Sequence, residues 1–308
     1  MDRLTATSKL RLGKAVMVPV WSSGFIVATL AVRHAPGLSL LFWRMSVAAL
    51  AMAAIAFAVR APWPRDRGAI LQMVVVGLLL QAAQFVGIFL ALQHGVAAGL
   101  TALLSGSSPL LVAVLATVLL DEHLEPVQWL GSAIGVGGVV LAVAAEINAG
   151  GDTLGFMFAL IGLAGLVGGT LVQRASGVRV DPRVANTIQL AVAATVMAPL
   201  AAVGGGFTVG TAALPPLAWL TFGLSIGAVM LFFWLLRNEK SGEATSFLYL
   251  VPATTAIAGV PILGQPLSVG AVIGLVLALI GVRTVSAPGT PTGDRMARRV
   301  GSLIRGST

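Results

Sequence analysis

Arg44 is the charged side chain with the clearest capacity for chemistry in this sequence, because it lies inside the long apolar run 38–59. A guanidinium in such a run can bind a carboxylate through two parallel hydrogen bonds. Its long aliphatic stem can instead carry the charge to the edge of the apolar layer, or the group can bond the carbonyls at a helix end. The sequence leaves both the ligand-binding and the structural interpretation open.

Two amides, Gln81 and Gln84, lie three residues apart near the middle of another apolar run, 69–93. On a helix they share a face, and each amide offers two donors and an acceptor, which suits a zwitterionic ligand. The alternative is a hydrogen bond to a neighbouring helix, which is worth about 0.6–2 kcal/mol in a membrane.

Four further residues lie at comparable depth in apolar runs and are candidate ligand-binding residues. They are Trp21, Ser22, Ser105 and Tyr249. Trp21 either stacks on a ligand or packs against a neighbour, since it lies away from the interfacial belt where tryptophan is usual. The hydroxyl groups can also repair backbone hydrogen bonds that a nearby proline removes. Tyr249 is the only tyrosine, and its phenol needs a hydrogen-bond partner in an apolar layer.

Pro109 and Pro252 are expected in the middle of two helices, where each removes an i→i−4 hydrogen bond and kinks its helix. Two such kinks at matching depth can serve as the hinges of a gate. Static kinks are the alternative.

The elements that carry these candidate residues are expected to be helices that cross a lipid bilayer. Hydrophobic residues make up 57% of the chain, charged residues make up 10%, and the mean hydropathy is +0.97. Ten apolar runs are long enough to cross about 30 Å of hydrocarbon, and in lipid they must be helical to satisfy their own backbone. The runs are 14–32, 38–59, 69–93, 96–120, 126–145, 154–174, 184–203, 215–236, 242–264 and 266–285. The first and seventh are the least regular, because Pro19 and Pro199 interrupt them.

The basic residues indicate how these helices are oriented. With the N-terminus in the cytoplasm, every Lys and Arg except Arg33 and Arg44 falls on the cytoplasmic side. This bias predicts that both ends of the chain are cytoplasmic and that the protein lies in the inner, or cell, membrane. The net charge of +8 follows from the same bias. It predicts attraction to anionic membrane lipid and no nucleic-acid partner.

A stretch in the first half of the chain recurs without gaps 143 residues later, with Gly131, for example, matched by Gly274. Matching Gly and Pro residues imply matching backbone geometry. An odd number of helices separates the copies, so they cross the membrane in opposite directions. The sequence therefore predicts an all-α integral membrane protein of ten transmembrane helices. We expect two inverted-topology repeats of five helices, residues 1–145 and 154–285, followed by a basic cytoplasmic tail at 286–308.

The run from Ala98 to Gly131, with its second copy from Ser241 to Leu267, resembles the repeat of the EamA family in the drug/metabolite transporter (DMT) superfamily. The resemblance implies a transporter that exports small metabolites by alternating access, most like the YddG-type exporters of aromatic and other neutral amino acids. Nucleotide-sugar or phosphate-sugar antiporters and multidrug exporters of the same superfamily are alternatives. One position departs from the family, since Gln265 replaces a Glu that the first repeat keeps at Glu122.

No catalytic site, metal site or cofactor is expected. The chain has no cysteine, its three histidines fall at span ends, and no Asp or Glu falls at a predicted midplane. An enzyme would need a nucleophile with a base, or metal ligands. The expected partners are a small-molecule substrate and lipid. Glycine pairs such as Gly131/Gly135 and Gly270/Gly274 predict that the fifth and tenth spans pack on each other or between the protomers of a homodimer.

Overall fold

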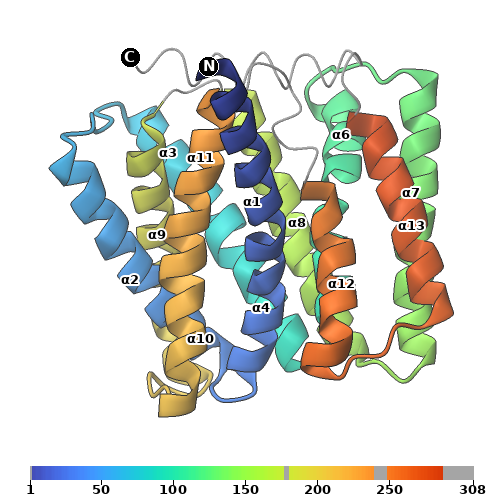
Figure 1. Cartoon of the computed structure of the whole chain (residues 1–308). Coiled ribbons are helices and arrows are strands. Elements are labelled where there is room, and N and C mark those ends of the chain that lie inside the picture. The colour runs from blue at the N-terminus through green and yellow to red at the C-terminus, as the bar shows by residue number, and fades with distance from the viewer. Residues whose placement is uncertain (1, 177–179, 239–247, 287–308) are drawn as a thin grey trace. The chain divides into compact units, whose positions relative to one another are not determined.

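The computed structural model describes residues 2–176, 180–238 and 248–286, and every regular element in these ranges is a helix (Figure 1). In chain order the elements are α1 (Asp2–Val32), α2 (Gly37–Ala58), α3 (Arg67–Val76), η1 (Gly77–Ala83), α4 (Gln84–Gln93), α5 (Ala98–Gly106), α6 (Ser108–Leu119), α7 (Pro126–Asn148), α8 (Thr153–Ser176), α9 (Pro182–Val203), η2 (Thr211–Ala213), α10 (Leu214–Ala218), η3 (Trp219–Ala228), α11 (Val229–Asn238), α12 (Leu250–Leu263) and α13 (Val269–Ser286). Two of them, η1 and η3, are π-helices, whose turns are wider than those of an α-helix.

Nine stretches of the described residues are helical, apolar and long enough to cross a membrane, and α12 is a shorter apolar helix. The two least regular runs are helices as predicted, because α1 continues through Pro19 and α9 through Pro199. The connection between the expected repeats 1–145 and 154–285 is shorter than those bounds imply, since α7 continues to Asn148 and α8 begins at Thr153. The start of the ninth run at 242–247 and the basic tail at 287–308 lie outside the described residues.

The chain forms two compact units, and each takes segments from both halves of the sequence. Unit 1 comprises Met1–Ile26, Ala98–Ala149 and Gly227–Thr308. Unit 2 comprises Val27–Ala97 and Gly150–Ile226. Two of the four boundaries fall inside α1 and inside η3, so both of these helices contribute to both units. These units group residues that lie close together in space, and they differ from the predicted repeats at 1–145 and 154–285. The two inverted repeats stay a prediction.

In unit 1, α7 and α13 lie side by side along a seam of glycines (Figure 1). A Cβ atom added at Gly281 would lie 2.4 Å from Cα of Gly135 and 2.5 Å from the carbonyl oxygen of Gly131. One added at Gly138 would lie 2.6 Å from the carbonyl oxygen of Gly274, so the two helices are antiparallel. The predicted packing of the fifth span on the tenth is confirmed. This contact accounts for the glycine pairs, and the homodimer stays a prediction.

In unit 2, α2 packs on α9 and α4 packs on α8 (Figure 1). The end of α2 meets the start of α9, where Ala56 and Val184 belong to one buried apolar cluster. The start of α2 meets the end of α9, where the hydroxyl of Ser39 donates to the carbonyl of Gly206 at 2.6 Å. These two helices are therefore antiparallel as well.

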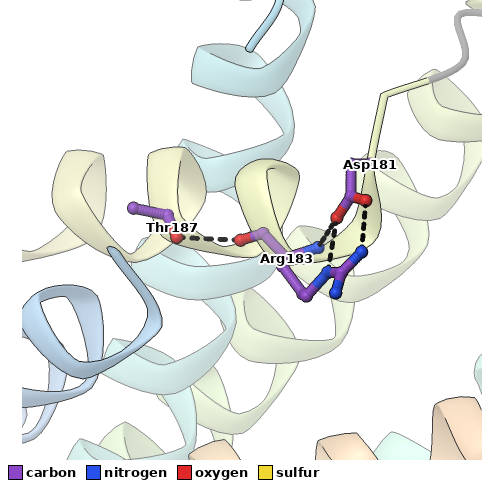
Figure 2. Close-up of polar contacts among 3 residues, drawn as sticks. All are labelled: Asp181, Arg183 and Thr187. Atoms are coloured by element: carbon purple, nitrogen blue, oxygen red, sulfur yellow. Dashed lines mark hydrogen bonds and ion pairs between the residues drawn. The ribbon is translucent and has the colours of Figure 1, made fainter. Parts of the chain in front are cut away.

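The start of α9 carries an acidic cap. Asp181 accepts hydrogen bonds from the backbone N of Arg183 at 2.9 Å and from its Nε at 3.0 Å, while Nη2 donates at 2.8 Å (Figure 2). The hydroxyl of Thr187 donates to the carbonyl of Arg183 at 2.8 Å, one turn later. The hydrogen bond from the Arg183 side chain holds the pKa of Asp181 below its usual range. A carboxylate here stabilises the helix by bonding its free amides and by opposing the positive end of its dipole.

Two parts of the fold depart from a regular helix at positions 143 residues apart. Asp121, with φ 49°, and Gly264, with φ 69°, are both left-handed residues just after α6 and α12. The next amide in each copy, that of Glu122 or Gln265, donates to a helix carbonyl six residues earlier, at 3.2 and 3.3 Å. The same 143-residue shift places the equivalent of η1 at 220–226, inside η3. The repeat in the sequence is thus matched by a repeat in local backbone geometry.

Candidate functional site

Arg44 of α2 is buried in unit 2, with 6% of its surface exposed. Its Nε donates to the hydroxyl of Ser225 at 3.1 Å. The guanidinium carbon lies 4.5 Å from the ring centre of Phe85 and 5.9 Å from that of Phe89, distances at which aromatic faces stabilise a cation. The guanidinium is therefore enclosed by side chains of unit 2, and both the ligand-binding and the structural interpretation stay predictions. In the described part of the chain no carboxylate forms an ion pair with Arg44.

Gln81 and Gln84 lie where the third span changes from π-helix to α-helix. Gln81 belongs to the π-helix η1 and Gln84 begins α4, so the span is helical as predicted but changes its hydrogen-bond pattern between the two amides. A glycine of α8 permits the wider turn, because a Cβ added at Gly165 would lie 2.7 Å from the carbonyl oxygen of Leu79 and 2.8 Å from N of Gln84. Both glutamine side chains are half-buried, and neither has a hydrogen-bond partner among the described residues. Such π-helical turns are frequent at functional sites.

Ser225 was not predicted as a site residue, although it holds the guanidinium of Arg44. It lies in η3 and is buried, and its hydroxyl donates to the carbonyl of Leu220 at 3.2 Å, five residues earlier. Thr221 is buried one turn before it and donates to the carbonyl of Leu217 at 2.7 Å. The only sequence pattern that could have indicated Ser225 is its spacing of four residues from Thr221, which places two hydroxyl groups on one face of an apolar span.

In unit 1, Trp21 and Ser22 join α1 to other helices. The ring of Trp21 packs edge-on against Phe232 of α11, with ring centres 5.6 Å apart. Ser22 is buried and its hydroxyl donates to the carbonyl of Val251 at 3.3 Å. Both side chains thus have the packing role that was the alternative to ligand binding, and their contact with a ligand stays a prediction.

Each proline of the expected gate lies in the first turn of a helix rather than in its middle. The fourth span is interrupted at Ser107, and Pro109 follows in the first turn of α6. Pro252 lies in the first turn of α12. The predicted loss of an i→i−4 bond is wrong at both places, because first-turn amides have no acceptor within their own helix. The hydroxyl of Ser105 donates to the carbonyl of Thr101 at 3.0 Å, a backbone contact of the kind expected for it.

Tyr249 and Pro252 belong to the packing of unit 1. Pro252 is buried against α5, since a Cβ added at Gly106 would lie 2.8 Å from its ring. Tyr249 occupies the N-cap position of α12 and packs on a buried cluster that includes Leu110. Its phenol hydrogen-bonds to Ser286, so the partner that the sequence required lies within the protein.

Gln265, at the position that departs from the family pattern, caps the start of another helix. Its Oε1 accepts a hydrogen bond at 3.0 Å from the backbone N of Ala98, the first residue of α5. An amide oxygen accepts such a bond as a carboxylate does.

Polar groups also meet at a helix end in unit 2. His94, after α4, lies 2.7 Å from the carboxylate of Asp152, which precedes α8. This hydrogen bond lowers the pKa of Asp152 below its usual range. Both groups are partly exposed. Among the described residues, no three His, Asp or Glu side chains lie together as a metal site would need.

The predicted site residues fall into two groups, one in each unit. Unit 1 holds Trp21, Ser22, Ser105, Pro109, Tyr249 and Pro252, and unit 2 holds Arg44, Gln81 and Gln84. In unit 1 most of the hydrogen-bonding capacity is used within the protein. In unit 2 the guanidinium and the two amides retain donors and acceptors that no described residue uses. Unit 2 therefore offers the groups best suited to bind a polar ligand.

The sequence matches the model of the EamA-like transporter family twice, over residues 14–144 and 153–287. The "Uncharacterized inner membrane transporter YedA" of Escherichia coli strain K12 is 25% identical over 265 residues, which cover 81% of each chain. The "Probable amino-acid metabolite efflux pump" of Salmonella typhimurium strain LT2 is 28% identical over 133 residues, or 43% of this chain and 42% of that protein. A crystal structure aligns with 95% of this chain and 99% of its own, at a TM-score of 0.58 and 19% identity, a likeness of fold alone.

Proposed function

Because the chain belongs to the EamA-like transporter family, we propose that it exports neutral and aromatic amino acids by alternating access between two inverted repeats. The protein is a multi-pass cell-membrane transporter, and its relatives are transporters rather than enzymes. The choice of amino acids is supported by the relative named as a probable amino-acid metabolite efflux pump. The YddG-like range of substrates belongs to this proposal, as does the cytoplasmic location of both chain ends.

The observation that carries the proposal is the repetition of the same irregular geometry in both halves of the chain. The π-helices η1 and η3, and the left-handed residues Asp121 and Gly264, are each related by the 143-residue shift. Inverted copies of one motif allow two conformations of similar free energy, open to opposite sides of the membrane.

The glycine seam between α7 and α13 supports the inverted arrangement. Gly131 contacts Gly281, and Gly138 contacts Gly274. The 143-residue shift makes Gly131 equivalent to Gly274 and Gly138 equivalent to Gly281. The contact between Gly131 and Gly281 is therefore equivalent to the contact between Gly274 and Gly138. A two-fold axis between antiparallel copies gives this pattern.

Counterflow in proteoliposomes tests the substrate class. The panel comprises neutral and aromatic amino acids, phosphorylated sugars and organic cations, and protein-free liposomes are the control. We expect exchange of amino acids. Exchange of phosphorylated sugars or organic cations without any amino acid would replace this proposal with an antiporter or a multidrug exporter.

The absence of cysteine from the sequence allows the mechanism to be tested with single cysteines. Ser105→Cys lies next to the interruption of the fourth span, and Val203→Cys at the exposed end of α9 is the surface control. We expect labelling at position 105 from either side of the membrane to change when amino acid is added, with labelling at 203 unchanged. Labelling at position 105 that does not change when amino acid is added would contradict an alternating-access movement at this position.

A further inference from the structure

Unit 2 contains a buried cation without an anion to balance it. Its acidic residues are Asp66, Asp152 and Asp181, and all three act at helix ends. Asp66 accepts from the amide of Ala69 at 2.7 Å, while the other two bond His94 and Arg183. A charge within the hydrocarbon layer is costly unless it is paired, and such residues usually serve a function. The counter-ion of Arg44 is therefore missing from its own unit.

The guanidinium of Arg44 also has unused donors. Nε is bonded to Ser225, but the four N–H groups on the two Nη atoms have no acceptor in the described part of the chain. Neither Nη atom belongs to the described side-chain atoms that are fully buried without a partner, although the residue as a whole is only 6% exposed. These donors therefore remain for a ligand that supplies acceptors. They form the edge of the group that binds carboxylates in a two-pronged fashion.

The surroundings of Arg44 restrict what this edge can bind. Phe85 covers the guanidinium at 4.5 Å, and Phe89 lies at 5.9 Å. Ser225 fixes the Nε edge, which leaves the group little freedom to turn. An aromatic wall beside a fixed cationic fork suits an anion with an apolar or aromatic body. It is less suited to a phosphate ester, for which several cationic groups are usual.

We propose that the Nη edge of Arg44 is a binding site for the carboxylate of a small organic monocarboxylate with an apolar body. The proposal rests on the proposed function and names the part of the amino acid that this residue binds. Gln81 and Gln84 lie on the helical stretch that carries Phe85, and their amide oxygens can accept from the ammonium group.

A purely positional role for Arg44 makes a different prediction. If Arg44 only holds η3 through Ser225, then Ser225→Ala should reproduce the loss seen in Arg44→Gln for every ligand alike. If Arg44 binds the carboxylate, Ser225→Ala keeps the preference for acids over amides and Arg44→Gln abolishes it. The two variants therefore separate binding from positioning.

The experiment measures competition with labelled L-phenylalanine on the full chain in nanodiscs. The competitors are 3-phenylpropionate, which keeps the carboxylate, and L-phenylalaninamide, which loses it. We expect the unaltered protein to bind 3-phenylpropionate at least about 10-fold more tightly than the amide. In Arg44→Gln the carboxylates should weaken by about 10- to 100-fold while the amide is unchanged, with Arg44→Lys intermediate. Thermal melting of each variant monitors folding.

The outcomes distinguish this site from the proposed function. Equal binding of acid and amide by the unaltered protein overturns the site and needs no variant to fold. Transport of amino acids that is unaffected in Arg44→Gln overturns the site and leaves the proposed function standing. If labelled 3-phenylpropionate binds in an Arg44-dependent manner but no amino acid is transported, the site stands and the proposed function fails.

Discussion

The glycine seam between α7 and α13 gives the most quantitative prediction. An alanine at position 281 would place its Cβ 2.4 Å from Cα of Gly135, whereas ordinary contact begins near 3.4 Å. The two helices must therefore separate by about 1 Å, and what obstructs the Cβ is backbone that cannot rotate away. Overpacking of this kind costs about 1–3 kcal/mol, and we expect Gly281→Ala to lie at the upper end of that range.

Gly137→Ala is the matched control, because Gly137 lies on the exposed side of α7 with nothing within 4 Å of an added Cβ. Replacing a helical glycine with alanine there should stabilise the protein by up to about 1 kcal/mol. Melting is followed by fluorescence-detected size exclusion in detergent. We expect Gly281→Ala to melt several degrees lower than the unaltered protein and Gly137→Ala at the same temperature or higher. Equal melting temperatures for the two variants would refute the close approach of these helices.

Three further predictions use other contacts and the same melting assay. Asp121→Gly should stabilise the protein by about 0.5–1 kcal/mol, because it removes the strain of a non-glycine residue at positive φ. Gly264→Ala at the equivalent position should destabilise the protein by about 1 kcal/mol for the same reason. Effects of the same sign would contradict the matched geometry. Gln265→Leu removes the cap of α5 and should cost about 0.5–2 kcal/mol, while Gln265→Glu keeps the acceptor, and an equal loss in both would show that the cap is unimportant. Because the pKa of Asp152 is lowered, its contribution to the stability of the folded protein is complete above the ordinary carboxyl pKa and is lost as pH falls through the lowered value. The melting temperature of Asp152→Asn, measured against pH, should therefore lack the decline at acid pH that this loss produces. An identical decline in the variant would mean that the contact with His94 has no such role.

Much of the fold follows from apolar runs and from the positions of Gly and Pro. Where they lie in the described ranges, the apolar runs form helices because lipid offers the backbone no other hydrogen-bond partners, so even Pro19 and Pro199 do not break α1 and α9. The packing of α7 on α13 was also predictable, since small residues spaced by four allow close approach. The helix ends at Asn148 and Leu250 were not, because terminal turns depend on local caps.

The candidate site was predicted less completely. Arg44 and the two glutamines are conspicuous as polar groups in apolar runs, whereas Ser225 is one hydroxyl among several. Its importance depends on Arg44, which is 181 residues away in the sequence. The prolines were placed in the wrong part of their helices, because proline signals an irregularity without indicating on which side of it the helix begins.

The sequence by itself determined that this chain crosses the membrane as helices, that part of it recurs 143 residues later, and that one arginine lies deep in an apolar run. Those properties depend on composition and spacing, which are local. Only the tertiary structure decided that the third and eighth spans contain π-helices, and that Arg44 meets Phe85 and Ser225 while no described carboxylate forms an ion pair with it. These features depend on how closely other helices approach, and long-range contacts of that kind leave no periodic pattern in the chain.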